Sequence, residues 1–175
     1  MIRLIVILTL VCTVAAFVLG ITYKSTAPLI AAQKEKQIKQ ALNQAAPDAD
    51  EFKEKKSDDN VYYEAYKNGQ LTGYIIFANA SGYSGDIEMM VGLDKNGQIT
   101  GIQILSQEET PGLGARCNEI KYGEKDQWFT RQFKQKRAQD LSLKNIQAIT
   151  GATITTEAVI KGVKESAEVF FKKIK

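Results

Sequence analysis

The 175-residue chain contains no histidine. Without an imidazole it cannot build a Ser-His-Asp triad, a histidine metal ligand or a haem axial histidine. It has two cysteines, Cys12 and Cys117, which lie far apart and form no CxxC pair, zinc pattern or evident disulfide framework. We therefore expect no metal site, and any redox chemistry must come from a bound organic cofactor.

The chain also lacks a strong excess of charge of either sign. Lysine and arginine number 23 against 20 acidic residues, which gives a net charge of +3. No basic stripe is interleaved with aromatic residues, and the lysines at the C-terminus are ordinary for the end of a helix. These features indicate no nucleic-acid partner. The length and the 44% hydrophobic content suit one globular domain with an appendage.

One long apolar run, Leu4 to Tyr23, has 20 residues and no charge. As a helix it would span roughly 30 Å, about the thickness of a bilayer core. It could be a membrane anchor, a cleaved signal peptide or a buried core helix. A core helix should have a polar face, which this run lacks. A signal peptide usually has a shorter apolar segment, and Phe17–Leu19 interrupts the small residues needed for cleavage. The pattern favours an uncleaved transmembrane anchor over residues 1–24, but the flanking charges do not settle its orientation.

Residues 25–60 indicate a helical stalk followed by a linker. We expect the stalk to begin near Ser25 or Thr26 and to end before Pro47. Its sparse apolar positions are Leu29, Ile30, Ile38 and Leu42. The segment after Pro47 mixes acidic and basic residues and is predicted to be a surface link.

Residues 61–175 predict an α+β domain. Val61–Tyr66 and Gly73–Asn79 flank an Asn-Gly pair, and Asp86–Asp94 and Gln98–Ser106 flank a second one, so we expect two hairpins in an antiparallel sheet. Helices should pack against this sheet.

Two helical segments are expected after the hairpins. A short one covers residues 126–136, where Trp128, Phe129 and Phe133 recur at helical spacing and are interpreted as core residues. A longer one runs from Thr156 to Lys175. Its apolar stripe consists of Val159, Val163, Ala167, Phe170 and Ile174.

Threonines crowd the turn before the last helix, in the segment Asn145–Val163. A helix N-terminus offers free N–H groups and partial positive charge, so it can bind an anion such as phosphate. Gly151 and Ala152 would let a ligand approach the backbone closely. From the residues alone, the threonines could equally serve only as helix caps.

Three motifs of this domain resemble one known family. "TGATITT" (Thr150–Thr156) is similar to a flavinylation motif, "ETPGLG" (Glu109–Gly114) matches a second signature, and "GYSGDIEMMVGLD" (Gly82–Asp94) resembles a third. Their order after an N-terminal membrane helix also agrees. The chain resembles the G subunits of Rnf complexes, membrane-bound ferredoxin:NAD oxidoreductases that translocate ions. The C subunit of the sodium-translocating NADH:quinone reductase is a relative.

The resemblance implies a covalent FMN. The attachment residue would be Thr153, through a phosphoester, within the tetrad completed by Thr150, Gly151 and Ala152. Thr155 and Thr156 would contact the phosphate or cap the helix. The remaining cofactor-binding positions would be Tyr83, Glu109, Thr110, Pro111, Gly112, Leu113 and Gly114, with Leu113 and backbone amides of the loop against the isoalloxazine ring.

The resemblance also implies the protein's role and partners. It would be an electron-carrier subunit of the cytoplasmic membrane, single-pass, with its main domain on the extracytoplasmic side and other Rnf membrane subunits as partners. A separate FAD-dependent flavin transferase would make the bond. Two alternatives remain open: an anchored reductase with noncovalent flavin, and a ligand-binding or sensory domain without flavin.

Two positions depart from the family pattern. Gln107 stands where many relatives carry histidine, which removes any proton transfer by that side chain. Gln147 stands where relatives commonly carry aspartate, six residues before Thr153. If the transferase reads that carboxylate, attachment would be slower.

Overall fold

The computed structural model describes residues 2–57, 60–121, 123 and 127–174. It divides into two compact units, Met1–Ile38 and Lys39–Lys175. The three predicted parts, 1–24, 25–60 and 61–175, stay a prediction, and their boundaries differ from this division.

Helix α1 runs without a break from Ile2 to Ala45, with Pro28 inside it. It is long and apolar enough to cross a membrane, and its most apolar stretch is unburied. The expected helix start near Ser25 or Thr26 is wrong, because the Thr26 hydroxyl donates to the carbonyl of Thr22, at 2.9 Å, instead of capping a free N–H. The helix does end before Pro47, as predicted.

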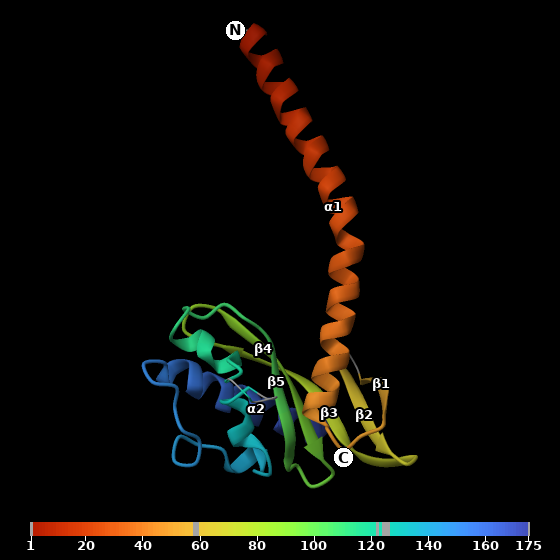
Figure 1. The fold of residues 1–175 in the computed structure, drawn as a ribbon, viewed down its shortest axis with the longest axis vertical. Coiled ribbons are helices and arrows are strands. Elements are labelled where there is room, and N and C mark those ends of the chain that lie inside the picture. The colour runs from red at the N-terminus through yellow and green to blue at the C-terminus, as the bar shows by residue number, and fades with distance from the viewer. Residues whose placement is uncertain (1, 58–59, 122, 124–126, 175) are drawn as a thin grey trace. The chain divides into compact units, whose positions relative to one another are not determined.

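The described residues of the second unit form five strands: β1 Glu51–Ser57, β2 Asn60–Lys67, β3 Gln70–Ser81, β4 Asp86–Asp94 and β5 Ile99–Gln107. Each strand pairs antiparallel with the next, so their order in the sheet is their order in the chain (Figure 1). Together with the helices this confirms the predicted α+β class.

Both predicted hairpins form, through different turns. Asn68 and Gly69 have φ values of 51° and 76°, the left-handed pair of a two-residue turn. In the second hairpin only Gly97 is left-handed, with φ 78°, and its N–H donates to the Asp94 carbonyl at 3.1 Å. The two turn-forming dipeptides therefore connect two of the strand pairs, β2 with β3 and β4 with β5.

The prediction of a surface link after Pro47 is wrong, because residues 51–57 form strand β1. Residues 58 and 59 of that segment lie outside the described residues. Strand β1 pairs with β2 over its whole length, from Glu51 opposite Tyr66 to Ser57 opposite Asn60. The strand was missed because an edge strand needs no apolar face, and lysines and glutamates are usual at such edges.

Helix α2, Thr153–Ile174, lies against the sheet and begins three residues before the predicted start. Val159, Val163 and Ala167 are buried, as expected, whereas Ile174 is 38% exposed. Gly162 brings the helix backbone close to β3, because a Cβ there would lie 2.9 Å from the Ala80 Cβ.

The described residues of this unit also form three 3₁₀ helices: η1 Gly114–Asn118, η2 Thr130–Phe133 and η3 Ala138–Asp140. The helix predicted over 126–136 is reduced to η2, and Asp126 lies outside the described residues. Phe129 and Phe133 are fully buried, which confirms their predicted place in the core, and Trp128 is half-buried.

The last turns of α1 belong to this unit and lie on β4 and β5. Ala41, Leu42 and Ala45 are buried. Thr100 Oγ1 donates to the Ala45 carbonyl at 2.6 Å. A Cβ on Gly101 would lie 2.9 Å from that same oxygen, so the strand accommodates the helix end by omitting a side chain.

Candidate functional site

A tight turn delivers the chain into α2. Gly151 has φ +76°, a conformation that favours glycine, and the Ala152 N–H donates to the Ile149 carbonyl at 2.9 Å. The Thr156 hydroxyl closes the turn, accepting from Ile149 N and donating to the Ala152 carbonyl, both at 3.0 Å. The Thr156 side chain therefore ties the first turn of α2 to the turn that precedes it.

The hydroxyl of the neighbouring Thr155 donates a hydrogen bond to a carboxylate. It is buried and donates to Glu109 Oε2. Glu109 lies 46 residues earlier in the chain, on the segment after β5. One hydrogen bond thus joins the "ETPGLG" loop to the start of α2.

Glu109 is only 5% exposed and is surrounded by donors. Its Oε1 accepts from Ser84 N at 2.9 Å, in the turn between β3 and β4. Burial raises the pKa of this carboxyl, but hydrogen bonds from the Thr155 hydroxyl and from the backbone at Ser84, Tyr83 and Gly85 outweigh it and hold the pKa below its ordinary value. Glu109 is therefore an ionised carboxylate at neutral pH.

Glycines make room for this carboxylate. A Cβ on Gly114 would overlap Glu109 Oε2 and lie 2.6 Å from Thr155 Oγ1. A Cβ on Gly82 would overlap Glu109 Oε1. The glycines of two sequence motifs thus permit the same close packing.

A cavity of about 490 Å³ opens beside these contacts. It is lined by Tyr83, Glu109, Thr110, Leu113, Gly114, Gly151, Ala152, Thr153, Ile154 and Thr155. The fold therefore brings together nine of the residues expected at the site. Thr150, Pro111, Gly112 and Thr156 do not line the cavity. Ile154 also lines the cavity but is not among the predicted site residues. Its position in the sequence between Thr153 and Thr155 is the feature that could have indicated it.

The hydroxyls at the cavity are not equivalent. Thr155 is bonded to Glu109, and the hydroxyl of Thr110 lies 3.1 Å from that of Ser84. Thr153 is exposed at the first residue of α2. Among the described threonines that line the cavity, it is the one whose hydroxyl has no hydrogen-bond partner.

Three exposed apolar side chains also line the cavity. Tyr83 is 72% exposed, Ile154 54% and Leu113 44%. The Leu113 N–H donates to the Thr110 carbonyl at 3.1 Å, which curls the loop. These side chains offer apolar surface to a flat ring.

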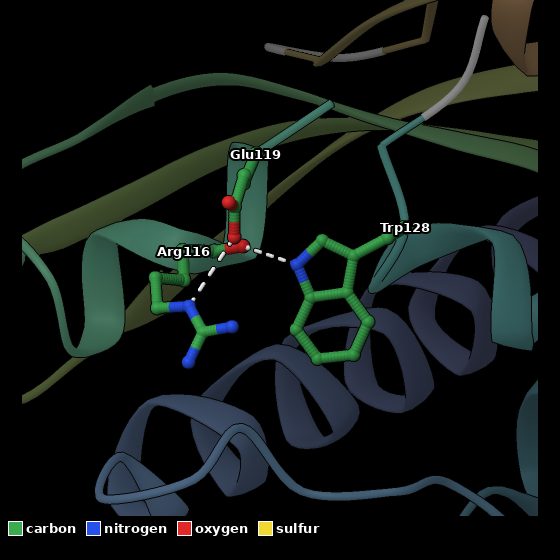
Figure 2. A network of polar contacts seen from close by, with 3 residues as sticks. All are labelled: Arg116, Glu119 and Trp128. Atoms are coloured by element: carbon green, nitrogen blue, oxygen red, sulfur yellow. Dashed lines mark hydrogen bonds and ion pairs between the residues drawn. The ribbon is translucent and has the colours of Figure 1, made fainter. Parts of the chain in front are cut away.

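The loop continues into η1, which a single tryptophan holds in place. Trp128 Nε1 donates to the Arg116 carbonyl at 3.0 Å, and Arg116 Nε pairs with Glu119 at 3.2 Å (Figure 2). Lys121 Nζ lies 4.6 Å from the centre of the indole ring. These contacts fix the C-terminal end of the loop.

The two positions that depart from the family pattern lie in different surroundings. Gln107 Oε1 accepts from Glu109 N at 2.6 Å and so shapes the loop. Gln147 is exposed, and its backbone is held on both sides by Gln132, which accepts from its N–H at 2.8 Å and donates to its carbonyl at 3.3 Å.

A larger cavity of about 610 Å³ lies elsewhere, between the β4–β5 turn, η3 and the second half of α2. Its lining includes Lys95, Arg137, Lys164 and Phe171 but none of the predicted site residues. Within the described part of the chain, no group of three or more cysteine, aspartate or glutamate residues is arranged to hold a metal ion.

Comparison with known proteins shows to which family the chain belongs. Residues 82–168 match the FMN-binding domain family. The G subunit of the proton-translocating ferredoxin:NAD(+) oxidoreductase complex of Clostridium ljungdahlii is 39% identical, over 92% of this chain and 86% of that protein. The G subunit of the ion-translocating oxidoreductase complex of Aliivibrio fischeri is 32% identical, over 91% and 85%. The crystal structure of NqrC from Shewanella oneidensis shares the fold, with a TM-score of 0.51 at 18% identity over 73% of this chain and 72% of that one. The chain therefore belongs to the family of Rnf-type G subunits, which are components of ion-translocating oxidoreductase complexes.

Proposed function

We propose that the chain is an electron-carrying subunit of a membrane-bound, ion-translocating ferredoxin:NAD oxidoreductase, with FMN attached through a phosphoester to Thr153. The observation that carries the proposal is the state of the Thr153 hydroxyl, which is exposed at the cavity and has no partner among the described residues. The chain would be a redox subunit of a complex and not a self-sufficient enzyme.

The residues at the cavity fit this group. The cavity volume of about 490 Å³ falls within the usual range for ligand pockets, roughly 300–1,000 Å³. The N-terminus of α2, a helix of 22 residues, favours a phosphate at Thr153. Leu113, Tyr83 and Ile154 offer apolar contacts to the ring. When bound, FMN supplies the redox chemistry, and the protein holds and orients it.

Attachment requires an outside catalyst, because a threonine hydroxyl is a weak nucleophile without activation. Among the described residues that line this cavity, Glu109 is the one carboxylate, and it already accepts hydrogen bonds from Thr155 and Ser84. A flavin transferase would use FAD as donor. In that reaction the Thr153 hydroxyl would take the FMN phosphate from FAD, with AMP as the leaving group of the broken pyrophosphate bond and the hydroxyl proton passing to the transferase or to water.

Helix α1 would anchor the protein in the cytoplasmic membrane, with the FMN-binding domain on the extracytoplasmic side and other membrane subunits of the complex as electron donor and acceptor. A covalent tether suits that side, because a flavin that dissociated there would be lost by dilution. The apolar, unburied stretch of α1 supports the anchoring.

The test is covalent flavin on the denatured chain. The full chain is produced with a flavin transferase, denatured, and separated on a gel that is viewed for flavin fluorescence. We expect a fluorescent band that Thr153→Val abolishes and Thr153→Ser, which keeps a hydroxyl, largely retains. Peptide mapping by mass spectrometry should place the added mass of FMN on Thr153.

Other outcomes support other functions. Flavin colour that is lost on denaturation would favour a reductase with noncovalent FMN. A protein that never takes up flavin, even when it is produced together with a flavin transferase, would favour a ligand-binding or sensory domain and would overturn the proposal.

A further inference from the structure

We propose that Glu109 is a positioning residue for flavin attachment, which acts through the Thr155 hydroxyl to hold the first turn of α2 so that, of the threonines in that turn, Thr153 alone presents a free acceptor hydroxyl. This inference rests on the proposed function. It assigns Glu109 to the protein's own architecture and not to direct contact with the cofactor.

The position of Glu109 between three segments is the first support. One carboxylate oxygen accepts from Thr155, in the first turn of α2, and the other accepts from Ser84 N, in the turn between β3 and β4. The backbone of Glu109 is itself held by Gln107, at 2.6 Å. The three segments that line the cavity therefore meet at a single side chain.

The distribution of hydroxyls is the second support. Thr155 would be a competing acceptor two residues from Thr153, but its proton is committed to Glu109 and its side chain is buried. Thr156 is likewise committed, to Ala152 and Ile149. The carboxylate thus removes one rival hydroxyl and fixes the helix turn that carries Thr153.

The packing around the carboxylate is the third support. A Cβ added to Gly82 or Gly114 would overlap one of the two oxygens of Glu109. Because the backbone of both glycines packs this closely, the Glu109 side chain has little freedom to take another position. Burying an ionised carboxylate is costly unless it is hydrogen-bonded. The donors around Glu109 and the positive end of α2 offset that cost.

The experiment measures the initial rate of flavin attachment to the full-length chain, purified in detergent, with purified flavin transferase, FAD and Mg²⁺. The variants are Glu109→Gln, Thr155→Val, Thr155→Ser and the double variant Glu109→Gln/Thr155→Val. Glu108→Gln is the matched control, because it makes the same chemical change at the adjacent, exposed carboxylate. Circular dichroism gives the folded fraction of each sample.

We expect Glu109→Gln and Thr155→Val each to slow attachment by about 10-fold or more at unchanged folded fraction, as fits the loss of a hydrogen bond to a charged group. The double variant should be no slower than the slower single variant, since the two groups act as one unit. Thr155→Ser should stay within about 3-fold of the unsubstituted chain and Glu108→Gln within about 2-fold, because the hydroxyl and the buried carboxylate are kept.

Two kinds of failure are distinguishable. If the unsubstituted chain takes up no covalent flavin, the proposed function fails. If it is flavinylated but Glu109→Gln matches Glu108→Gln, or the two single effects multiply in the double variant, the positioning role is overturned. Should Glu109→Gln not fold, the contrast between Thr155→Val and Thr155→Ser decides, and equal rates for those two would refute the role.

Discussion

At the start of α2, residues of one type take on separate tasks. Thr156 bridges the turn, Thr155 donates to a buried carboxylate, and Thr153 is left exposed. The sequence motif predicted that these residues meet, but it could not assign the tasks. The assignment depends on Glu109, whose contact with Thr155 spans 46 positions of sequence.

Glu109 should make stability depend on pH in one direction. Its pKa in the folded protein lies below the ordinary value of 4.5. Its stabilising contribution is therefore complete above that value and is lost as the pH falls through the folded-state pKa. We expect Glu109→Gln to lower the free energy of unfolding at pH 7 and to differ progressively less from the unsubstituted chain between about pH 4.5 and pH 2. Urea titrations across this range measure it, and a constant difference would contradict it.

The Thr156 hydroxyl should be a structural group and not a cofactor contact. Thr156→Val removes both its hydrogen bonds and leaves Ile149 N buried without that partner, so we expect a loss of roughly 1–3 kcal/mol in the free energy of unfolding. Thr153→Val, at an exposed and unbonded position, should change it by less than about 0.5 kcal/mol. Denaturant unfolding of the flavin-free protein compares the two, and equal losses would count against the assignment.

At the scale of elements, structure that depends on neighbouring residues could be predicted from the sequence, whereas structure that depends on distant contacts could not. The Asn-Gly pairs at Asn68 and Asn96 predicted both hairpins, because turn chemistry acts within four residues. Strand β1 was missed, since its partner β2 and not its own composition makes it a strand. Helix α2 begins at Thr153 because side-chain contacts from Thr155 and Thr156 support the extra turn.

The contact between the end of α1 and β5 should tolerate no added side chain. Gly101→Ala would place a Cβ 2.9 Å from the Ala45 carbonyl oxygen, and we expect it to lower the free energy of unfolding by roughly 1–3 kcal/mol. Gly20→Ala has no atom within 4 Å of its Cβ and serves as the control for the same substitution. Thermal unfolding followed by circular dichroism measures both, and similar midpoints would contradict the close packing.

At the scale of the whole molecule, the folded unit starts earlier than its sequence suggests. The apolar anchor, the sheet and the last helix were all predicted, yet the boundary at residue 61 leaves out β1 and the end of α1. In the sequence, residues 39–45 look like more of the same helix, and it is the burial of Ala41, Leu42 and Ala45 and the hydrogen bond from Thr100 to Ala45 that show they belong to the second unit.

Truncation tests this boundary. A chain that starts at Lys39 should unfold like one that starts at Lys34. A chain that starts at Pro47 loses four buried side chains, those of Ala41, Leu42, Ala45 and Ala46, and should be less stable by roughly 2–4 kcal/mol. Urea unfolding of the three chains measures this, and equal stability would place the boundary after the helix.

The order of the strands also has a consequence in time. Because β1 to β5 pair in the sequence in which they are synthesised, each strand can join its predecessor as it emerges. The two loops that face the cavity are therefore in place before α2, the last of the described elements, has been made. The proposed acceptor, Thr153, lies on that helix, so the proposed attachment site would be complete only after α2 has been synthesised and has docked. If FMN is attached to Thr153 as proposed, we expect the flavin transferase to act on the finished domain and not on the growing chain.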